Sequence, residues 1–73
     1  MDNTWQIDLD LAGYEGERDL ASLIESCGGV LLEGMPEAWS ACVFRGTTCV
    51  EGTTPTEAVA RLWIALNAKQ KVI

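Results

Sequence analysis

The sequence predicts one small α+β domain over residues 1–73, in which two helices cover an antiparallel sheet of three to four strands. Three observations indicate this class: one segment of strict two-residue alternation, two segments with helical spacing of apolar residues, and β-prone runs separated by turns. The predicted order is strand, helix, three strands, helix. Short connections make the last three strands a meander, and the helices must lie on the sheet to bury their apolar stripes.

The first element is predicted from alternation over residues 4–11. One face carries Trp5, Ile7, Leu9 and Leu11, and the other carries Gln6, Asp8 and Asp10. A period of two over eight residues indicates a half-buried strand with one solvated face. Residues 13–16 have the glycine-rich composition of a turn.

A change of period predicts a helix over residues 17–27. Its stripe is Leu20, Leu23, Ile24 and Cys27, with Glu17 and Asp19 in the first turn and Gly28–Gly29 ending it through a left-handed residue. Three β-prone runs follow, over 30–32, 38–45 and 47–51, with a break at 34–36 and a turn at Arg45–Gly46. The middle run is apolar on both faces, which predicts a central strand covered on both sides or a strand at a subunit contact.

The closing helix has the best-marked start. Thr54 is the predicted N-cap, accepting from the N–H of Glu57, while the Glu57 carboxylate accepts from the N–H of Thr54. Pro55 suits the first helical position. An apolar stripe follows at Val59, Leu62, Trp63 and Leu66, and Glu57 is expected to pair with Arg61 on the outer face.

Composition limits the chemistry. Three cysteines without a Cys-x-x-Cys spacing, and no histidine, indicate reduced, buried thiols of a cytosolic protein and no zinc site or other cofactor. Without histidine, general acid–base catalysis would depend on carboxylates, lysine, cysteine or tyrosine. Catalysis is therefore poorly supported, and we expect that the protein is not an enzyme. Asp8 and Asp10 could hold a divalent cation, although a solvated strand face is the favoured interpretation. The N-terminus lacks the basic start of a signal peptide, and the chain lacks an apolar run of about 18 residues. We therefore expect no signal peptide and no membrane span.

Charge is unevenly distributed along the chain. Residues 1–37 contain nine acids and one base, a net charge of −8, whereas residues 38–73 contain two acids and four bases, a net charge of +2. A surface of this kind repels nucleic-acid phosphates and suits a basic protein partner. The alternative is that the acids only keep a small domain soluble.

Three segments carry a resemblance to small tailed-phage proteins of the phage ABA-sandwich type. They are the Trp-containing strand at 38–43, the Gly-x-Thr segment at 52–58, and the Ala/Leu-rich helix containing Arg61 at 60–66. The same strand-to-helix ending is similar to HicB-type antitoxin domains. The resemblance covers roughly two-thirds of the chain, from about Glu17 onward. It implies a phage or prophage source, hence the host cytoplasm, and no particular activity.

Two functions are expected from these features. The first is a stoichiometric inhibitor that binds a basic patch on a host nucleic-acid-handling or defence protein, such as a CRISPR effector, through Asp8, Asp10, Tyr14, Glu15, Glu17 and Asp19. The second is a homo-oligomer that sequesters a signalling nucleotide through Arg45 and Arg61, near which Lys69 and Lys71 could gather. Trp39 and Phe44 lie on opposite faces of one predicted strand, and an exposed aromatic face would need to be covered. A homodimer is therefore a further possibility.

Overall fold

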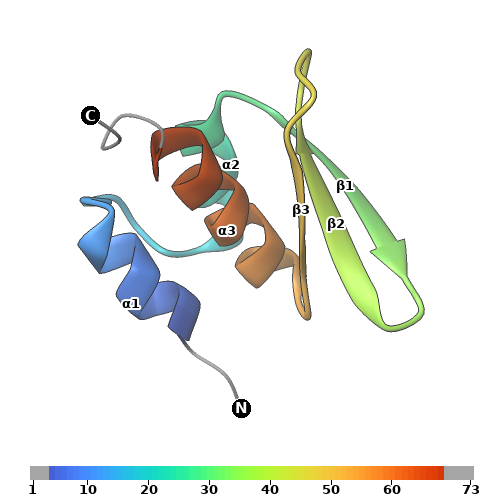
Figure 1. Ribbon diagram of the computed structural model, residues 1–73, viewed down its shortest axis with the longest axis horizontal. Coiled ribbons are helices and arrows are strands. Elements are labelled where there is room, and N and C mark those ends of the chain that lie inside the picture. Colours follow the sequence, from blue (N-terminus) through green and yellow to red (C-terminus); the bar gives the residue numbers. More distant parts are fainter. Residues whose placement is uncertain (1–3, 69–73) are drawn as a thin grey trace.

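The computed structural model describes residues 4–68, and within them it contains three helices and one three-stranded antiparallel sheet, as Figure 1 shows. The elements are α1 (Thr4–Leu11), α2 (Leu20–Cys27), β1 (Val30–Met35), β2 (Ala38–Val43), β3 (Cys49–Gly52) and α3 (Pro55–Ala68). The predicted α+β class is therefore confirmed, as is the meander order β1-β2-β3.

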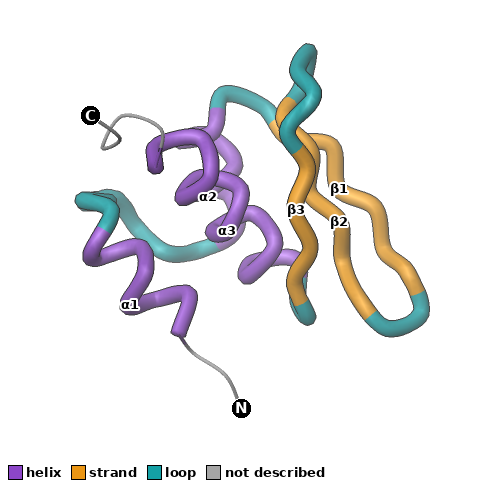
Figure 2. Tube along the Cα trace, viewed as in Figure 1, coloured by secondary structure: helices purple, strands orange, loops and turns teal. Residues whose placement is uncertain are grey.

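The helices and the strands form two separate blocks, with every helix on the same side of the sheet (Figure 2). α3 lies between the sheet and α1, and it contacts α1, α2 and all three strands. The buried core therefore gathers around α3, where Ala58, Val59, Ala60 and Leu62 are all fully inaccessible to solvent. The other face of the sheet carries no helix from the described part of the chain.

The first element corrects the prediction from alternation, because residues 4–11 form a helix and not a strand. Trp5 and Leu9 are four residues apart, so a helix places both on one side, where they join the core. Ile7 and Leu11 are then 59% and 70% exposed. A helix also satisfies its backbone hydrogen bonds internally, whereas a strand here would need a sheet edge to pair with.

Arg18 fixes the position of α1. Its guanidinium donates to the backbone carbonyl of Gln6 at 3.0 Å and forms an ion pair with the carboxylate of Asp10. Asp10 lies in the last turn of α1, where a positive charge is favourable because of the helix dipole, and Gln6 lies one turn earlier. The long side chain thus links the loop before α2 to the end of α1.

α2 begins later than predicted and ends where predicted. Asp19 is its N-cap and not a first-turn residue, because its carboxylate accepts from the N–H of Ser22 at 3.1 Å. At the other end Gly28 has φ +80°, and the N–H groups of Gly28 and Gly29 donate to carbonyls of the last turn. This confirms the predicted left-handed glycine stop.

β2 is the central strand, pairing Leu32 with Ala41 on one side and Val50 with Ala41 on the other. Among the described residues the helices pack on one face of the sheet only, so coverage of β2 on both sides was a wrong prediction, whereas a subunit contact at this strand stays a prediction. β1 extends to Met35 and so includes Gly34 and Met35 of the predicted break at 34–36. A side chain at Gly34 would approach the Trp39 indole to 3.1 Å. The glycine leaves room for the ring that lies over it.

The cysteines also depart from the prediction of reduced thiols. Cys42 and Cys49 are register partners on β2 and β3, and they form a disulfide. Cys27 keeps its thiol, which is half-buried, and burial raises its pKa to about 11. The error arose because an odd cysteine count was taken as evidence against any pairing.

Candidate functional site

Tyr14, predicted as an exposed aromatic anchor, is a core residue. It is 6% exposed, and its ring packs edge-to-face on Trp63 with the centroids 5.0 Å apart. Its hydroxyl donates to the backbone carbonyl of Glu17 at 2.5 Å. Tyr14 therefore stabilises the loop between α1 and α2 and is not available to a partner.

The five acids predicted to bind a partner fall into three groups. Asp10 is paired with Arg18, and the hydrogen bond from the backbone N–H of Ser22 lowers the pKa of Asp19. Asp8 is half-buried on α1. Of these five acids, only Glu15 and Glu17 are exposed and have neither an ion pair nor a capping role. The predicted acidic surface thus shrinks to the loop that follows α1.

Arg45 and Arg61, the residues predicted to hold an anionic ligand, lie near opposite ends of β2. Arg45 follows the end of β2 in a turn, with φ +67°, and its guanidinium lies over the Phe44 ring at 5.5 Å. Arg61 borders a hollow that also contains Ala38, the first residue of β2. Since β2 has six residues, about 20 Å separate these ends. Lys69 and Lys71 lie outside the described residues.

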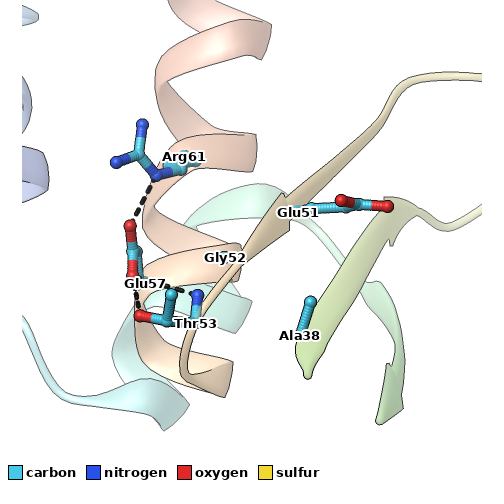
Figure 3. Close-up of a pocket in the computed structure, with 6 residues that line it drawn as sticks. All are labelled: Ala38, Glu51, Gly52, Thr53, Glu57 and Arg61. Carbon is cyan, nitrogen blue, oxygen red and sulfur yellow. Dashed lines mark hydrogen bonds and ion pairs between the residues drawn. The ribbon is translucent and has the colours of Figure 1, made fainter. Parts of the chain in front are cut away.

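The hollow beside Arg61 has a volume of about 340 Å³ and is formed where β3 leads into α3. Figure 3 shows the Glu57 carboxylate between Arg61 and Thr53, with Glu51 pointing away from this group. Glu57 accepts from the N–H of Thr53 at 3.0 Å, from the Thr53 hydroxyl at 2.5 Å and from Arg61 Nε at 2.8 Å. The predicted Glu57–Arg61 pair forms, but Glu57 is buried and not on an outer face.

These contacts also correct the predicted capping box. Thr54 Oγ1 accepts from the N–H of Glu57 at 3.1 Å, as predicted, but the carboxylate reaches Thr53 and not Thr54. The Thr53 hydroxyl is the main cause that lowers the pKa of Glu57, and Arg61 acts in the same direction. A carboxylate held ionised by three donors has little tendency to take a proton, so this group stabilises the β3–α3 junction and does not suggest a general base.

The uncovered face of the sheet was not anticipated as a site. Register places Glu33, Ser40 and Glu51 in one row across the three strands, and Leu31, Cys42 and Cys49 in the next. Leu31 and Met35 are 57% and 49% exposed. A second hollow of about 390 Å³ lies here, lined by Ser40, Cys49, Val50 and Glu51. The alternation of Leu31, Glu33 and Met35 with core-facing residues was the available signal, but the prediction ended this strand at residue 32 and so did not include it.

Charge is the dominant property of the described surface. Residues 4–68 contain ten acids and three arginines, since Asp2, Lys69 and Lys71 fall outside them. Two of the arginines, Arg18 and Arg61, form ion pairs with acids. Eight acids therefore have no ion-pair partner in this part of the chain, against one arginine that is not in an ion pair.

Comparison of the chain with models of protein families, with curated proteins and with solved structures finds no match. Within residues 4–68, no three acidic, cysteine or histidine side chains come close enough together to hold a metal ion. None of the helices described over that range has both the length and the apolarity needed to cross a bilayer.

Proposed function

We propose that this protein is a small phage-type accessory protein of the host cytoplasm that binds a basic surface of a host protein stoichiometrically. Its target would be a nucleic-acid-handling or defence protein such as a CRISPR effector, whose nucleic-acid-binding surface it would occupy. The proposal rests on one observation. In residues 4–68, eight acids have no ion-pair partner, whereas only one arginine is not in an ion pair.

The distribution of these acids supports binding over mere solubility. Proteins that bind nucleic acid do so through lysine and arginine surfaces, and a compact acidic domain is complementary to such a surface. The acids without a structural role include Glu33 and Glu51, which share one row on the uncovered sheet face. Two exposed apolar side chains on that face, Leu31 and Met35, add contact area that a purely solubilising surface does not need.

The test is a competition experiment with purified CRISPR effectors. The protein is added to each effector, the complex is measured by native mass spectrometry, and binding of target DNA is followed by fluorescence anisotropy. We expect a one-to-one complex that blocks DNA binding and weakens as salt rises. If no effector forms a complex even at low salt, inhibition of this class of target is wrong.

A matched pair of variants separates charge from fold. Replacing Glu15, Glu17, Glu33 and Glu51 by glutamine removes four acids that are in neither ion pair of the described residues. The replacement should abolish the complex while leaving the circular dichroism spectrum unchanged. The control replaces Asp10 and Arg18 together by asparagine and glutamine, which removes a neutral pair. The control should bind like the unmodified protein, and equal binding by both variants would contradict the role of charge.

A further inference from the structure

β1 has one edge that no described strand covers, because within residues 4–68 β1 pairs only with β2. The N–H of Phe44 donates to the carbonyl of Gly29 at 3.1 Å, which sets the alternation of the ladder. With the observed register, Leu31, Glu33 and Met35 direct their backbone groups to β2. The backbone groups of residues 30, 32 and 34 therefore face the open edge.

The side chains along this edge form a short pattern on the uncovered face. Leu31, Glu33 and Met35 alternate with core-facing residues, so all three lie on the face without helices, and all three are exposed. Successive members are about 6.6 Å apart along the strand. The strand residues on this face include two acids, Glu33 and Glu51, and no base.

We propose that the free edge of β1 binds an extended segment of the basic partner as a fourth strand, in which a lysine or arginine lies between two apolar residues. The backbone groups of residues 30, 32 and 34 bind the main chain of that segment. Its apolar side chains pack on Leu31 and Met35, and its basic side chain pairs with Glu33 across the strands. This inference rests on the proposed function and names the surface and the recognition pattern.

Three features favour a segment over a second copy of the chain. The uncovered face measures about 14 by 20 Å, or about 300 Å², far below the about 800 Å² per partner of a stable protein interface. In the antiparallel register that pairs Leu32 with its own copy, the two Glu33 side chains would lie about 7–8 Å apart. Each chain also carries a net charge of −6, which opposes self-association.

The test uses a synthetic peptide with blocked termini, in which valine, lysine and valine follow in this order, each flanked on both sides by threonine. This pattern is symmetric, so it presents the same side chains in either strand direction. Binding is followed by chemical-shift changes in heteronuclear NMR spectra of the full chain. We expect the changes to concentrate on β1 and on its neighbours in β2. Methylation of the backbone nitrogens of the lysine and of the two threonines beside it should abolish binding, because one of these sets faces β1 in either strand direction and the charge is unchanged.

Variants of the protein test the charge pairing. Glu33→Lys should weaken binding of the lysine peptide about tenfold, because a cross-strand attraction becomes a repulsion, and should restore binding to the peptide with glutamate in place of lysine. Glu25→Lys, an exposed acid on α2 with the same change of charge, is the matched control and should retain binding within about twofold. Equal losses in both variants would show a general charge effect and overturn the proposal.

The remaining outcomes separate this inference from the proposed function. Shift changes at residues 15–19 in place of β1 overturn the edge as the binding surface, while the basic-partner proposal still stands. Binding that tolerates the methylated peptide overturns strand addition. Absence of any peptide binding also overturns the edge proposal, whereas the proposed function is judged separately by complex formation with effectors. Sedimentation equilibrium that shows a dimer, dissociated by Leu32→Pro at the edge, overturns it in favour of a second copy.

Discussion

Removal of the Cys42–Cys49 disulfide by the double substitution Cys42→Ser and Cys49→Ser should lower the free energy of unfolding by about 2.5 kcal/mol. The two residues are seven apart in sequence, so the bond closes a loop of eight residues. Loop-closure entropy for a loop of that size is about 8 cal/mol/K in the unfolded chain, which gives this figure at 25 °C. For a domain of this length, the melting temperature should fall by roughly 10–20 °C.

The assay is thermal unfolding followed by far-ultraviolet circular dichroism, with and without a phosphine reductant. The reductant should bring the unmodified protein to the midpoint of the double-serine variant and leave that variant unchanged. Cys27→Ala is the control, because Cys27 is outside the disulfide and its variant should still respond to the reductant. If the disulfide is present by mass and both proteins nevertheless unfold at the same midpoint, the loop-closure reasoning is refuted.

Two further substitutions test the fold and the buried carboxylate. Leu9→Ala should cost about 2–5 kcal/mol of stability in urea unfolding and Ile7→Ala no more than about 0.5, because only Leu9 is buried on α1; similar costs would favour a strand, where both share a face. Glu57→Gln should cost about 1.5–3 kcal/mol, since it weakens charge-assisted hydrogen bonds from Thr53 and Arg61. Because folding lowers the pKa of Glu57 from 4.5, its contribution is complete above pH 4.5 and is lost as the pH falls below it. The glutamine variant should therefore show a shallower loss of stability in acid, and an unchanged slope would contradict this role.

Elements with local signals were predictable from the sequence. Thr54 and Pro55 mark the start of α3, and Gly28 marks the end of α2, because caps depend on residues a few positions apart. The helix over residues 4–11 was not predictable in this way. Its four alternating apolar residues fit a strand, but they also contain the i, i+4 pair Trp5 and Leu9, which fits a helix. Which pair is buried depends on packing against α3, more than forty residues later in the chain.

The disulfide had a signal that was present but not used. The predicted turn at Arg45–Gly46 sets the register of β2 and β3, and a hairpin centred there places Cys42 opposite Cys49. By contrast, the burial of Tyr14 and the Asp10–Arg18 ion pair could not be foreseen, because both depend on α1 being a helix and on how it packs. Charge can be counted from a sequence, but which acids stay without a partner is a property of the fold.

The layered arrangement places one tryptophan in each layer: Trp5 on α1, Trp39 on β2 and Trp63 on α3. The outermost layer reaches the rest of the protein mainly through α3 and the Arg18 side chain. Opening of α1 alone exposes less apolar surface than opening of the sheet against α3, so its amides should exchange with solvent deuterium first. Three variants that each retain one of the three tryptophans would give a separate fluorescence signal for each layer.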